Sequence, residues 1–335
     1  MPKLSLLSGS YTGPGGDGLK LLSFDAATGS FALIRSFPGT PDVSWIAFNP
    51  ATRTVYVTDE MAEKAGAFTL STDATSATPL GYQPTGAKYP CYIRLSPDGT
   101  KLATANYGDD SLPVYAIAAN GALTPNPTVL RGTQPHEKGH CHWTQWSPEG
   151  DRLYTVDLGH DEVRCWPYAN GKPGAGSVAY ATPKGSGPRH LAFHPNGKFA
   201  YLWTEYANVL TALKRQPDGR LTEINVLSAL PPEFKDTSYG AHIEIDAKGE
   251  NVYVSNRGHN SIAVFAIAAD GSISLKQIIS CGGDWPRFFL LLGQHLVVAN
   301  QKSETLVTFD IAGDGTVKPN GQAFMLQAPV ALLPI

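Results

Sequence analysis

Five segments of the chain share one pattern: WIAFNPATRTVYVTDE from Trp45, YIRLSPDGTKLATANY from Tyr92, WTQWSPEGDRLYTVDL from Trp143, HLAFHPNGKFAYLWTE from His190 and HIEIDAKGENVYVSNR from His242. A shorter relative, FFLLLGQHLVVANQ, starts at Phe288. The starting positions step by 47, 51, 47, 52 and 46 residues. A fixed period near 50 residues is typical of propellers, solenoids and repeat arrays.

Each repeat contains the signals of several short strands. Alternating apolar residues such as Leu191 and Phe193 mark a first strand. A turn around a proline such as Pro97 follows, and a β-branched and aromatic run such as Asn251–Ser255 marks the second strand. A third run, as in Ser261–Ile267, and a fourth complete the unit. Four antiparallel strands in about 50 residues indicate one propeller blade.

The two ends of the chain supply a seventh unit. Residues 328–335 resemble a lone first strand, while Leu4–Ser8 and Gly18–Phe24 resemble a second and a third strand. Joining them closes the ring and removes its exposed edges. The sequence therefore predicts an all-β fold: a seven-bladed β-propeller, with four antiparallel strands per blade and the last blade closed by both termini. Residues 1–335 would form a single domain.

Composition excludes several classes of protein. The net charge of −3 argues against a nucleic-acid binder, which usually presents a strongly basic face. No run approaches the roughly 18 apolar residues of a membrane-spanning helix, and the N-terminal stretch lacks the pattern of a signal peptide. Four cysteines without a CxxC pair indicate neither a disulfide framework nor a zinc ribbon. We expect a cytoplasmic protein that binds neither nucleic acid nor membrane.

The repeat points to candidate functional residues, because positions that diverge to charge in only a few blades are not needed to build a blade. In a blade, the start of the first strand and the end of the second lie on the same face, around the mouth of the central channel. We call the first of these positions the ring residues: Ser44, Cys91, His142, Arg189, Ala241, Arg287 and Val330. The second strands end in Glu60, Tyr107, Leu158, Glu205, Arg257, Gln301 and Tyr11.

The charged members of these two sets should therefore converge on one mouth. They are His142, Arg189, Glu205, Arg257 and Arg287, with Glu60 at the same level and His140 and His242 close by. Arginines keep their charge in proteins, so a group of three calls for an anion. Histidine can move protons near neutral pH. The pattern favours a site for a small anionic molecule; the alternative is that the arginines bond carbonyl groups between blades.

Two shorter motifs are interpreted as coincidences. Gly13–Gly18 satisfies GxGxxG, but a strand-like run follows it where a dinucleotide site needs a helix. His136–His140 satisfies HExxH, but Pro135 and Gly139 disfavour the helix that a zinc peptidase requires. His140 and His142 could still share a metal, because alternate residues of a strand point the same way. No carboxylate completes an obvious ligand set, and we expect neither metal nor cofactor.

At these residues the chain resembles the seven-bladed propeller lactonase family, which includes propeller-type 6-phosphogluconolactonases and carboxy-cis,cis-muconate cyclases. The resemblance covers nearly the whole chain and is most specific at Gly187–His190 with Phe193–Pro195, at Glu205 and at Val254–Ile262. The characteristic histidine, two arginines and glutamate of the family match His142, Arg189, Arg257 and Glu205. A Pro-Arg pair matches Pro286–Arg287. One departure is His242-Ile243-Glu244, where the family usually has an acid first and a histidine last.

The resemblance implies hydrolysis of a sugar-acid lactone without a metal. His142 would be the base that activates water, Arg189 and Arg257 would stabilise the oxyanion, and Glu205 would orient the histidine or an arginine. Arg287, His140, His242 and Glu60 would contact the anionic lactone. Two alternatives stay open: cyclisation of a muconate to a lactone, in which arginines would bind carboxylates, and a noncatalytic propeller that acts as a binding scaffold.

Overall fold

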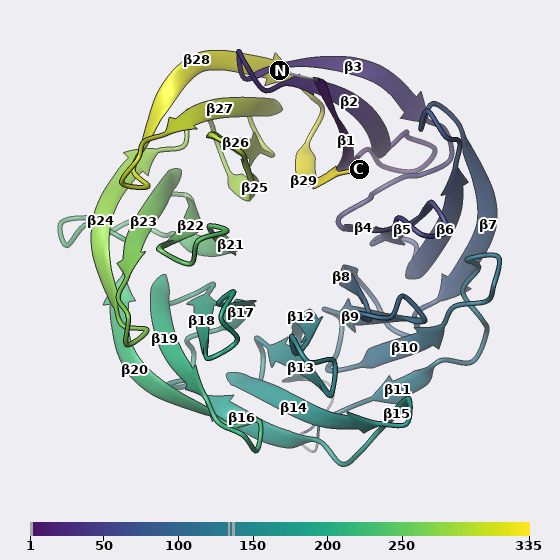
Figure 1. Ribbon diagram of the computed structural model, residues 1–335, viewed down its shortest axis with the longest axis horizontal. Coiled ribbons are helices and arrows are strands. Elements are labelled where there is room, and N and C mark those ends of the chain that lie inside the picture. The colour runs from purple at the N-terminus through teal and green to yellow at the C-terminus, as the bar shows by residue number, and fades with distance from the viewer. Residues whose placement is uncertain (1–2, 133–134, 136–137) are drawn as a thin grey trace.

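The computed structural model describes residues 3–132, 135 and 138–335, and its strands form seven sheets around a central axis (Figure 1). Neighbouring strands within each blade are antiparallel, which confirms the seven-bladed propeller predicted from the repeat. The described residues contain no helix that is long and apolar enough to cross a membrane. In this described part of the chain, only the fourth blade departs from four strands, because the short strand β15 also pairs with β14.

Each blade begins with its innermost strand and proceeds outward from the axis. The closing blade is β29 (Pro329–Pro334), β1 (Lys3–Ser10), β2 (Leu19–Asp25) and β3 (Ser30–Phe37). The next is β4 (Ile46–Asn49), β5 (Thr54–Asp59), β6 (Lys64–Leu70) and β7 (Ala77–Pro84). Then come β8 (Pro90–Leu95), β9 (Lys101–Asn106), β10 (Leu112–Ala116) and β11 (Thr128–Leu130). The fourth blade is β12 (Cys141–Trp146), β13 (Arg152–Asp157), β14 (Glu162–Ala169) and β16 (Ser177–Ala181), with β15 (Lys172–Pro173).

The last three blades follow the same order. They are β17 (Pro188–Phe193), β18 (Phe199–Thr204), β19 (Val209–Arg215) and β20 (Leu221–Ser228); β21 (Tyr239–Ile245), β22 (Asn251–Arg257), β23 (Ser261–Ile267) and β24 (Ile273–Ser280); and β25 (Pro286–Leu292), β26 (His295–Asn300), β27 (Thr305–Ile311) and β28 (Val317–Met325). The first strands of all the blades therefore surround the axis (Figure 1).

A repeated side-chain contact joins neighbouring blades at four of their junctions. A fully buried tyrosine of the second strand donates its hydroxyl hydrogen to the carbonyl oxygen of a glycine in an outer turn of the following blade. The pairs are Tyr56 with Gly121 (2.9 Å), Tyr154 with Gly219 (3.0 Å), Tyr201 with Gly271 (3.1 Å) and Tyr253 with Gly315 (2.8 Å). Each glycine has a positive φ, which a residue without a Cβ adopts at little cost. These contacts satisfy the buried hydroxyl groups of the interblade core.

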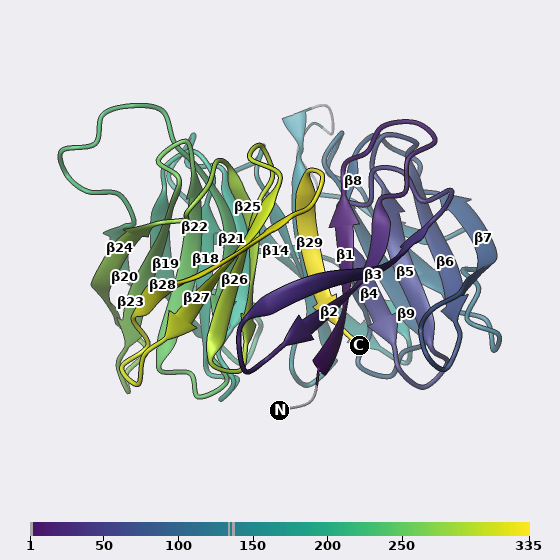
Figure 2. The same cartoon turned by 90° about the horizontal axis from the view of Figure 1, so that it is seen from above.

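The two ends of the chain close the ring. β29 pairs antiparallel with β1, from Leu6 opposite Pro334 to Ser10 opposite Pro329. The side chains of Val330, Ala331 and Leu332 are buried by this pairing. Figure 2 shows β29 and β1 side by side, running between the two faces of the ring.

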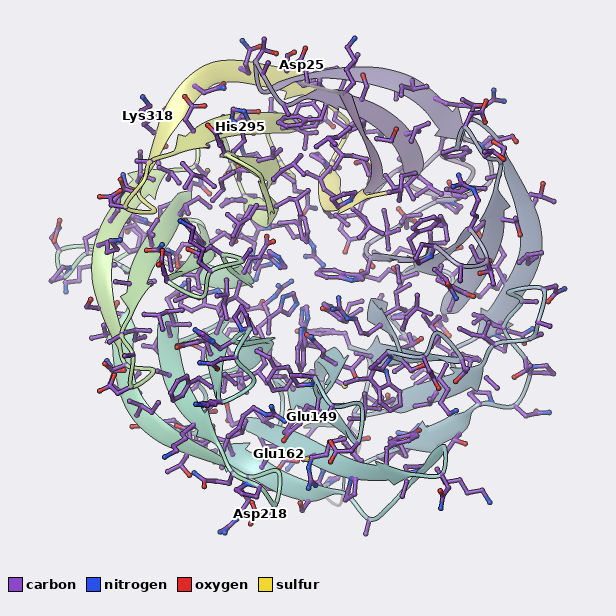
Figure 3. All side chains as sticks on the ribbon, viewed as in Figure 1. Asp25, Glu149, Glu162, Asp218, His295 and Lys318 are labelled. Atoms are coloured by element: carbon purple, nitrogen blue, oxygen red, sulfur yellow. The ribbon has the colours of Figure 1, made fainter. Side chains whose placement is uncertain are left out.

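Side chains fill the central channel, whereas labelled charged residues such as Asp218 and Lys318 lie at the periphery (Figure 3). On the innermost strands, six rings contact one another at centroid distances of 4.0–6.1 Å. We call them the aromatic layer: Trp45, Tyr92, Trp143, His190, His242 and Phe288. Each occupies the first position of its sequence repeat. The layer separates a cavity at the ring residues from a second cavity on its other side.

Candidate active site

The ring residues lie at β-bulges of the innermost strands. The register between first and second strands shifts from Pro90 to Tyr92, from Cys141 to Trp143, from Pro188 to His190 and from Pro286 to Phe288. The residue that each shift skips is Cys91, His142, Arg189 or Arg287. A bulge adds an unpaired residue and redirects its side chain, and bulges recur next to active sites. The same distortion therefore presents a different side chain in each blade.

A proline fixes the approach to three of these bulges. Pro90, Pro188 and Pro286 precede Cys91, Arg189 and Arg287. The residues before them, Tyr89, Gly187 and Trp285, have positive φ values of 57°, 59° and 67°. Gly187 adopts this conformation at little cost, but it is uncommon for residues with a Cβ such as Tyr89 and Trp285, and such strain clusters at functional sites. The local backbone is therefore shaped to position the ring residues.

A cavity of about 170 Å³ lies where these bulges meet the ends of the second strands. Its walls are formed by Glu60, Cys91, Tyr107, His142, Glu205, Arg257 and Arg287. We call this space the arginine–glutamate cavity. These residues come from different blades and meet at one mouth, as the ring pattern predicts. The charged side chains among them are at most 18% exposed, so they are largely removed from solvent.

Glu205 binds two arginines: Arg257, which lines the cavity, and Arg189, which lies behind the cavity wall. Its Oε2 lies 3.1 Å from Nε of Arg189, and its Oε1 lies 2.9 Å from Nη2 of Arg257. Burial alone would raise the pKa of Glu205, but Arg257 and Arg189 outweigh it and hold that pKa below its usual value. Glu205 is therefore an anion that fixes both guanidinium groups. Among the described contacts, it makes no hydrogen bond to His142.

Both of these arginines also bond backbone carbonyl groups of β21, which belongs to the blade next to that of Arg189 and to the same blade as Arg257. Nη1 of Arg189 donates to the carbonyl oxygen of Ala241, and Nη2 of Arg257 donates to that of Gly240 at 2.8 Å. The Arg257 guanidinium further packs against the ring of Trp285, with its central carbon 5.4 Å from the ring centroid. Both side chains thus bond backbone carbonyl groups and also bring positive charge to the region of the cavity. The Nε of Arg257 has no hydrogen-bond partner in the described structure.

A second cluster of polar side chains connects Tyr11, near the N-terminus, with Arg287, in the last complete blade of the chain. Nη2 of Arg287 donates to the hydroxyl oxygen of Tyr11 at 2.7 Å, and that hydroxyl donates to Oε2 of Glu60 at 2.7 Å. Nη2 of Arg287 also lies 4.0 Å from Oε2 of Glu60. Three guanidinium groups (Arg189, Arg257, Arg287) and two carboxylates (Glu205, Glu60) leave one net positive charge, which suits an anionic ligand.

His142 is a neutral imidazole in this positive surrounding. Burial, together with the charges of Arg189 and Arg287, holds the pKa of His142 well below its usual value. Its Nδ1 lies 3.8 Å from Sγ of Cys91, and its ring contacts Tyr107 edge-on at 5.5 Å between centroids. Burial also raises the pKa of Cys91 far above its usual value, so that residue is a thiol and not a nucleophilic thiolate.

The structure places three of the predicted site residues away from the cavity wall. Arg189 lies behind Glu205, bonded to Ala241 and to Nε2 of His190 (3.1 Å). His140 stacks on Tyr107 with centroids 4.6 Å apart, and its Nδ1 is 2.6 Å from the carbonyl oxygen of that residue. His242 belongs to the aromatic layer and lines the second cavity, which lies on the other side of that layer from the arginine–glutamate cavity. The expectation that His242 lies at the mouth with the arginines is therefore corrected.

Three residues that contact the site are not among the predicted candidates: Tyr11, Cys91 and Tyr107. All of them occupy the ring or strand-end positions, so the alignment of the repeats is enough to place them at the mouth. Selection by charge alone misses them, because their side chains are polar but uncharged.

The described residues hold no group of three or more His, Cys, Asp and Glu side chains that could bind a metal ion. The bulge at His142 breaks the strict alternation that would have aligned it with His140. Of the HExxH match, His136 and Glu137 lie outside the described residues. After the GxGxxG match comes strand β2 and not a helix, as the sequence indicates.

Comparison with known proteins places these features in a family. Residues 5–334 match the family model described as lactonase, 7-bladed beta-propeller. The chain is 31% identical over 314 residues to a 6-phosphogluconolactonase of Bacillus subtilis, covering 90% of this chain and 89% of that one. It is 28% identical to a 6-phosphogluconolactonase of Formosa agariphila, covering 88% of each. A periplasmic gluconolactonase of Pseudomonas aeruginosa superposes with a TM-score of 0.91 at 29% identity, covering 100% of this chain and 99% of that one.

Proposed function

The chain belongs to the seven-bladed β-propeller lactonase family, and on that basis we propose that it hydrolyses a sugar-acid lactone of the 6-phosphogluconolactone type in the arginine–glutamate cavity. The observation that carries the proposal is the composition of that cavity. A buried neutral imidazole faces a space with one excess positive charge, in a wall formed by residues of several blades. An anionic lactone supplies both the missing negative charge and a carbonyl group that water can attack.

In the proposed reaction, His142 accepts a proton from water while the water oxygen bonds to the lactone carbonyl carbon. Arg257 stabilises the negative charge that develops on the carbonyl oxygen. The ring carbon–oxygen bond then breaks, and the protonated His142 returns its proton to the leaving alkoxide. The product is an open-chain hydroxy acid. Every proton that His142 takes is given back, so the proposed steps balance without a metal or a cofactor.

The other polar residues bind the substrate or position the residues that do. Arg287, held by Tyr11 and Glu60, provides the charge that binds the anionic group of the substrate. Arg189 acts through Glu205, because it lies behind that carboxylate and fixes its orientation. Tyr107 separates His140 from the cavity, which gives His140 a role in supporting that wall. We further propose a cytoplasmic location, which cell fractionation tests; the similar Pseudomonas protein is periplasmic.

The function is tested with purified, chelator-treated protein and three substrates: fresh 6-phosphogluconolactone, gluconolactone and a carboxymuconate. The proposal predicts turnover of the phosphorylated lactone above its spontaneous hydrolysis, with a higher kcat/KM than for gluconolactone. Loss of muconate ultraviolet absorbance without lactone hydrolysis would indicate a cyclase instead. No turnover of any of the three would favour a binding scaffold.

A further inference from the structure

The far side of the aromatic layer holds a second cavity that hydrolysis does not use. Its volume is about 350 Å³, within the range of small-molecule sites. All six members of the aromatic layer line it on one side. The innermost strands line it two residues further along, at Arg94, Gln145, Ala192, Glu244, Leu290 and Leu333. We call it the lower cavity.

One of the residues that line the lower cavity carries a buried polar atom without a partner. His242 is 8% exposed, and its buried Nδ1 has no hydrogen-bond partner in the described structure. Its ring packs on Phe288, with centroids 4.2 Å apart, and on Trp45 at 5.8 Å. A buried polar atom without a partner costs free energy, typically about 1–3 kcal/mol. A hydroxyl group of a ligand that packs against His242 and reaches Nδ1 would remove that cost.

The lower cavity differs from the arginine–glutamate cavity in charge. Burial raises the pKa of Glu244 to about 8, so its carboxyl group is protonated at neutral pH. Burial also lowers the pKa of His242 to about 3, which keeps it neutral. The remaining charged side chains in the lining, Arg94 and Asp246, have opposite signs. The lining therefore carries no net charge and offers hydrogen bonds from neutral groups.

From these observations we propose that the lower cavity binds an uncharged, hydroxyl-rich ring of monosaccharide size. Its apolar face would pack on the aromatic layer, and its hydroxyl groups would bond to His242, Gln145 and the carboxyl group of Glu244. The aromatic rings suit a ring-shaped ligand, and the neutral polar groups suit hydroxyl groups better than a phosphate or a carboxylate. This site is distinct from the proposed site of lactone hydrolysis, because His142 does not line the lower cavity.

The test uses saturation-transfer NMR with methyl β-D-glucopyranoside, which is uncharged and has no lactone to hydrolyse. Sodium gluconate serves as the charged counterpart. The proposal predicts that the glucoside binds and that His242→Phe, which keeps a ring on Phe288 but removes Nδ1, weakens its affinity about tenfold, the loss expected for one buried hydrogen bond. Gln145→Leu, on a half-exposed side chain, should weaken binding severalfold while lactone hydrolysis is unchanged.

The matched control is His142→Ala, which alters the other cavity. It should abolish lactone hydrolysis and leave glucoside binding intact, so failure of the proposed reaction and failure of the second site are distinguishable. Three results would overturn the proposal: no saturation transfer to the wild-type protein, binding lost in His142→Ala but retained in His242→Phe, or gluconate binding that His242→Phe removes. If His242→Phe does not fold, Gln145→Leu decides alone, and unchanged binding in it overturns the proposal.

Discussion

His142 has a proton affinity that depends on the charges around it. In the free enzyme, burial and the nearby arginines hold its pKa well below the usual value. An anion bound at Arg257 and Arg287 offsets their charge, so the pKa of His142 rises when an anionic substrate binds. The base therefore becomes stronger in the complex, and the negative charge of the substrate contributes to catalysis as well as to binding.

The pH dependence of the free enzyme follows from this lowered pKa. His142 stays unprotonated at every pH above its own pKa, which lies below the ordinary value near 6.5. We expect kcat/KM for gluconolactone, which has no titrating group, to stay level as the pH falls from 7.5 through 6.5. The loss of activity should begin at lower pH. An acid limb with a midpoint at or above pH 6.5 in stopped-flow assays would contradict the assigned state of His142.

Arg287 provides a second test at the level of one side chain. In Arg287→Gln the cavity loses its excess positive charge, while Tyr11 and Glu60 keep each other as partners. We expect KM for 6-phosphogluconolactone to rise about tenfold or more, because a charged hydrogen bond contributes about 1.5–3 kcal/mol. KM for gluconolactone should change much less. Equal changes for both substrates in initial-rate assays would show that Arg287 does not bind the anionic group.

At the scale of single elements, the turn before β17 sets the position of Arg189. Gly187 has a φ of 59°, and a Cβ there would lie 2.5 Å from the ring of Tyr206. Its carbonyl oxygen accepts a hydrogen bond from the backbone N–H of Glu205 at 2.6 Å. Gly185, in the same turn, has a φ of 81° but open space around it. A comparison of alanine substitutions at the two glycines therefore distinguishes the cost of a positive φ from a displacement of the site residues.

We expect Gly187→Ala to lower both stability and activity. The positive φ costs roughly 1–2 kcal/mol in either alanine variant, but the contact with Tyr206 also shifts the backbone that holds Arg189 and Glu205. Gly185→Ala should therefore lose a similar or smaller amount of stability and keep its kcat. Chemical denaturation and initial rates measure the two effects. Full activity in Gly187→Ala would show that this turn does not control the cavity.

The innermost strands also show where prediction from sequence reaches its limit. The recurring positions of the repeat place Arg189, Arg257, Glu205 and His142 in one group, and the structure brings all of them to one end of the channel. The bulges are not visible in the sequence pattern, since they depend on how each first strand pairs with the second. His242 directly follows ring residue Ala241 and occupies the first position of its repeat, and the structure shows that this position forms the aromatic layer.

For the whole molecule, the repeat period is enough to predict seven blades and their closure, because each blade buries its faces against its neighbours. The contact of Arg287 with Tyr11 is not predictable in this way. These residues are 276 positions apart and meet only because β29 and β1 share a blade. Long-range side-chain contacts of this kind depend on the geometry of the closed ring.

Ring closure can therefore be tested together with the site. Deleting residues 329–335 removes the buried Val330, Ala331 and Leu332 and exposes the edge of β1. We expect a loss of stability on the order of 4–6 kcal/mol from the buried apolar surface, and loss of activity because Tyr11 follows β1. Deleting Ile335 alone is the control and should have little effect. Guanidinium denaturation measures the stability of each deletion variant, and lactone assays measure its activity. A stable, active 1–328 protein would contradict the closure model.

The central claim is that His142 performs acid–base catalysis of lactone hydrolysis in the arginine–glutamate cavity. Its most direct test is kcat for 6-phosphogluconolactone in His142→Ala, with folding checked by circular dichroism. We predict a fall of about 10²–10⁴-fold, the usual contribution of a general base, in a protein that keeps its β-sheet spectrum. A His142→Ala protein that hydrolyses the lactone at the wild-type rate would contradict this role of His142.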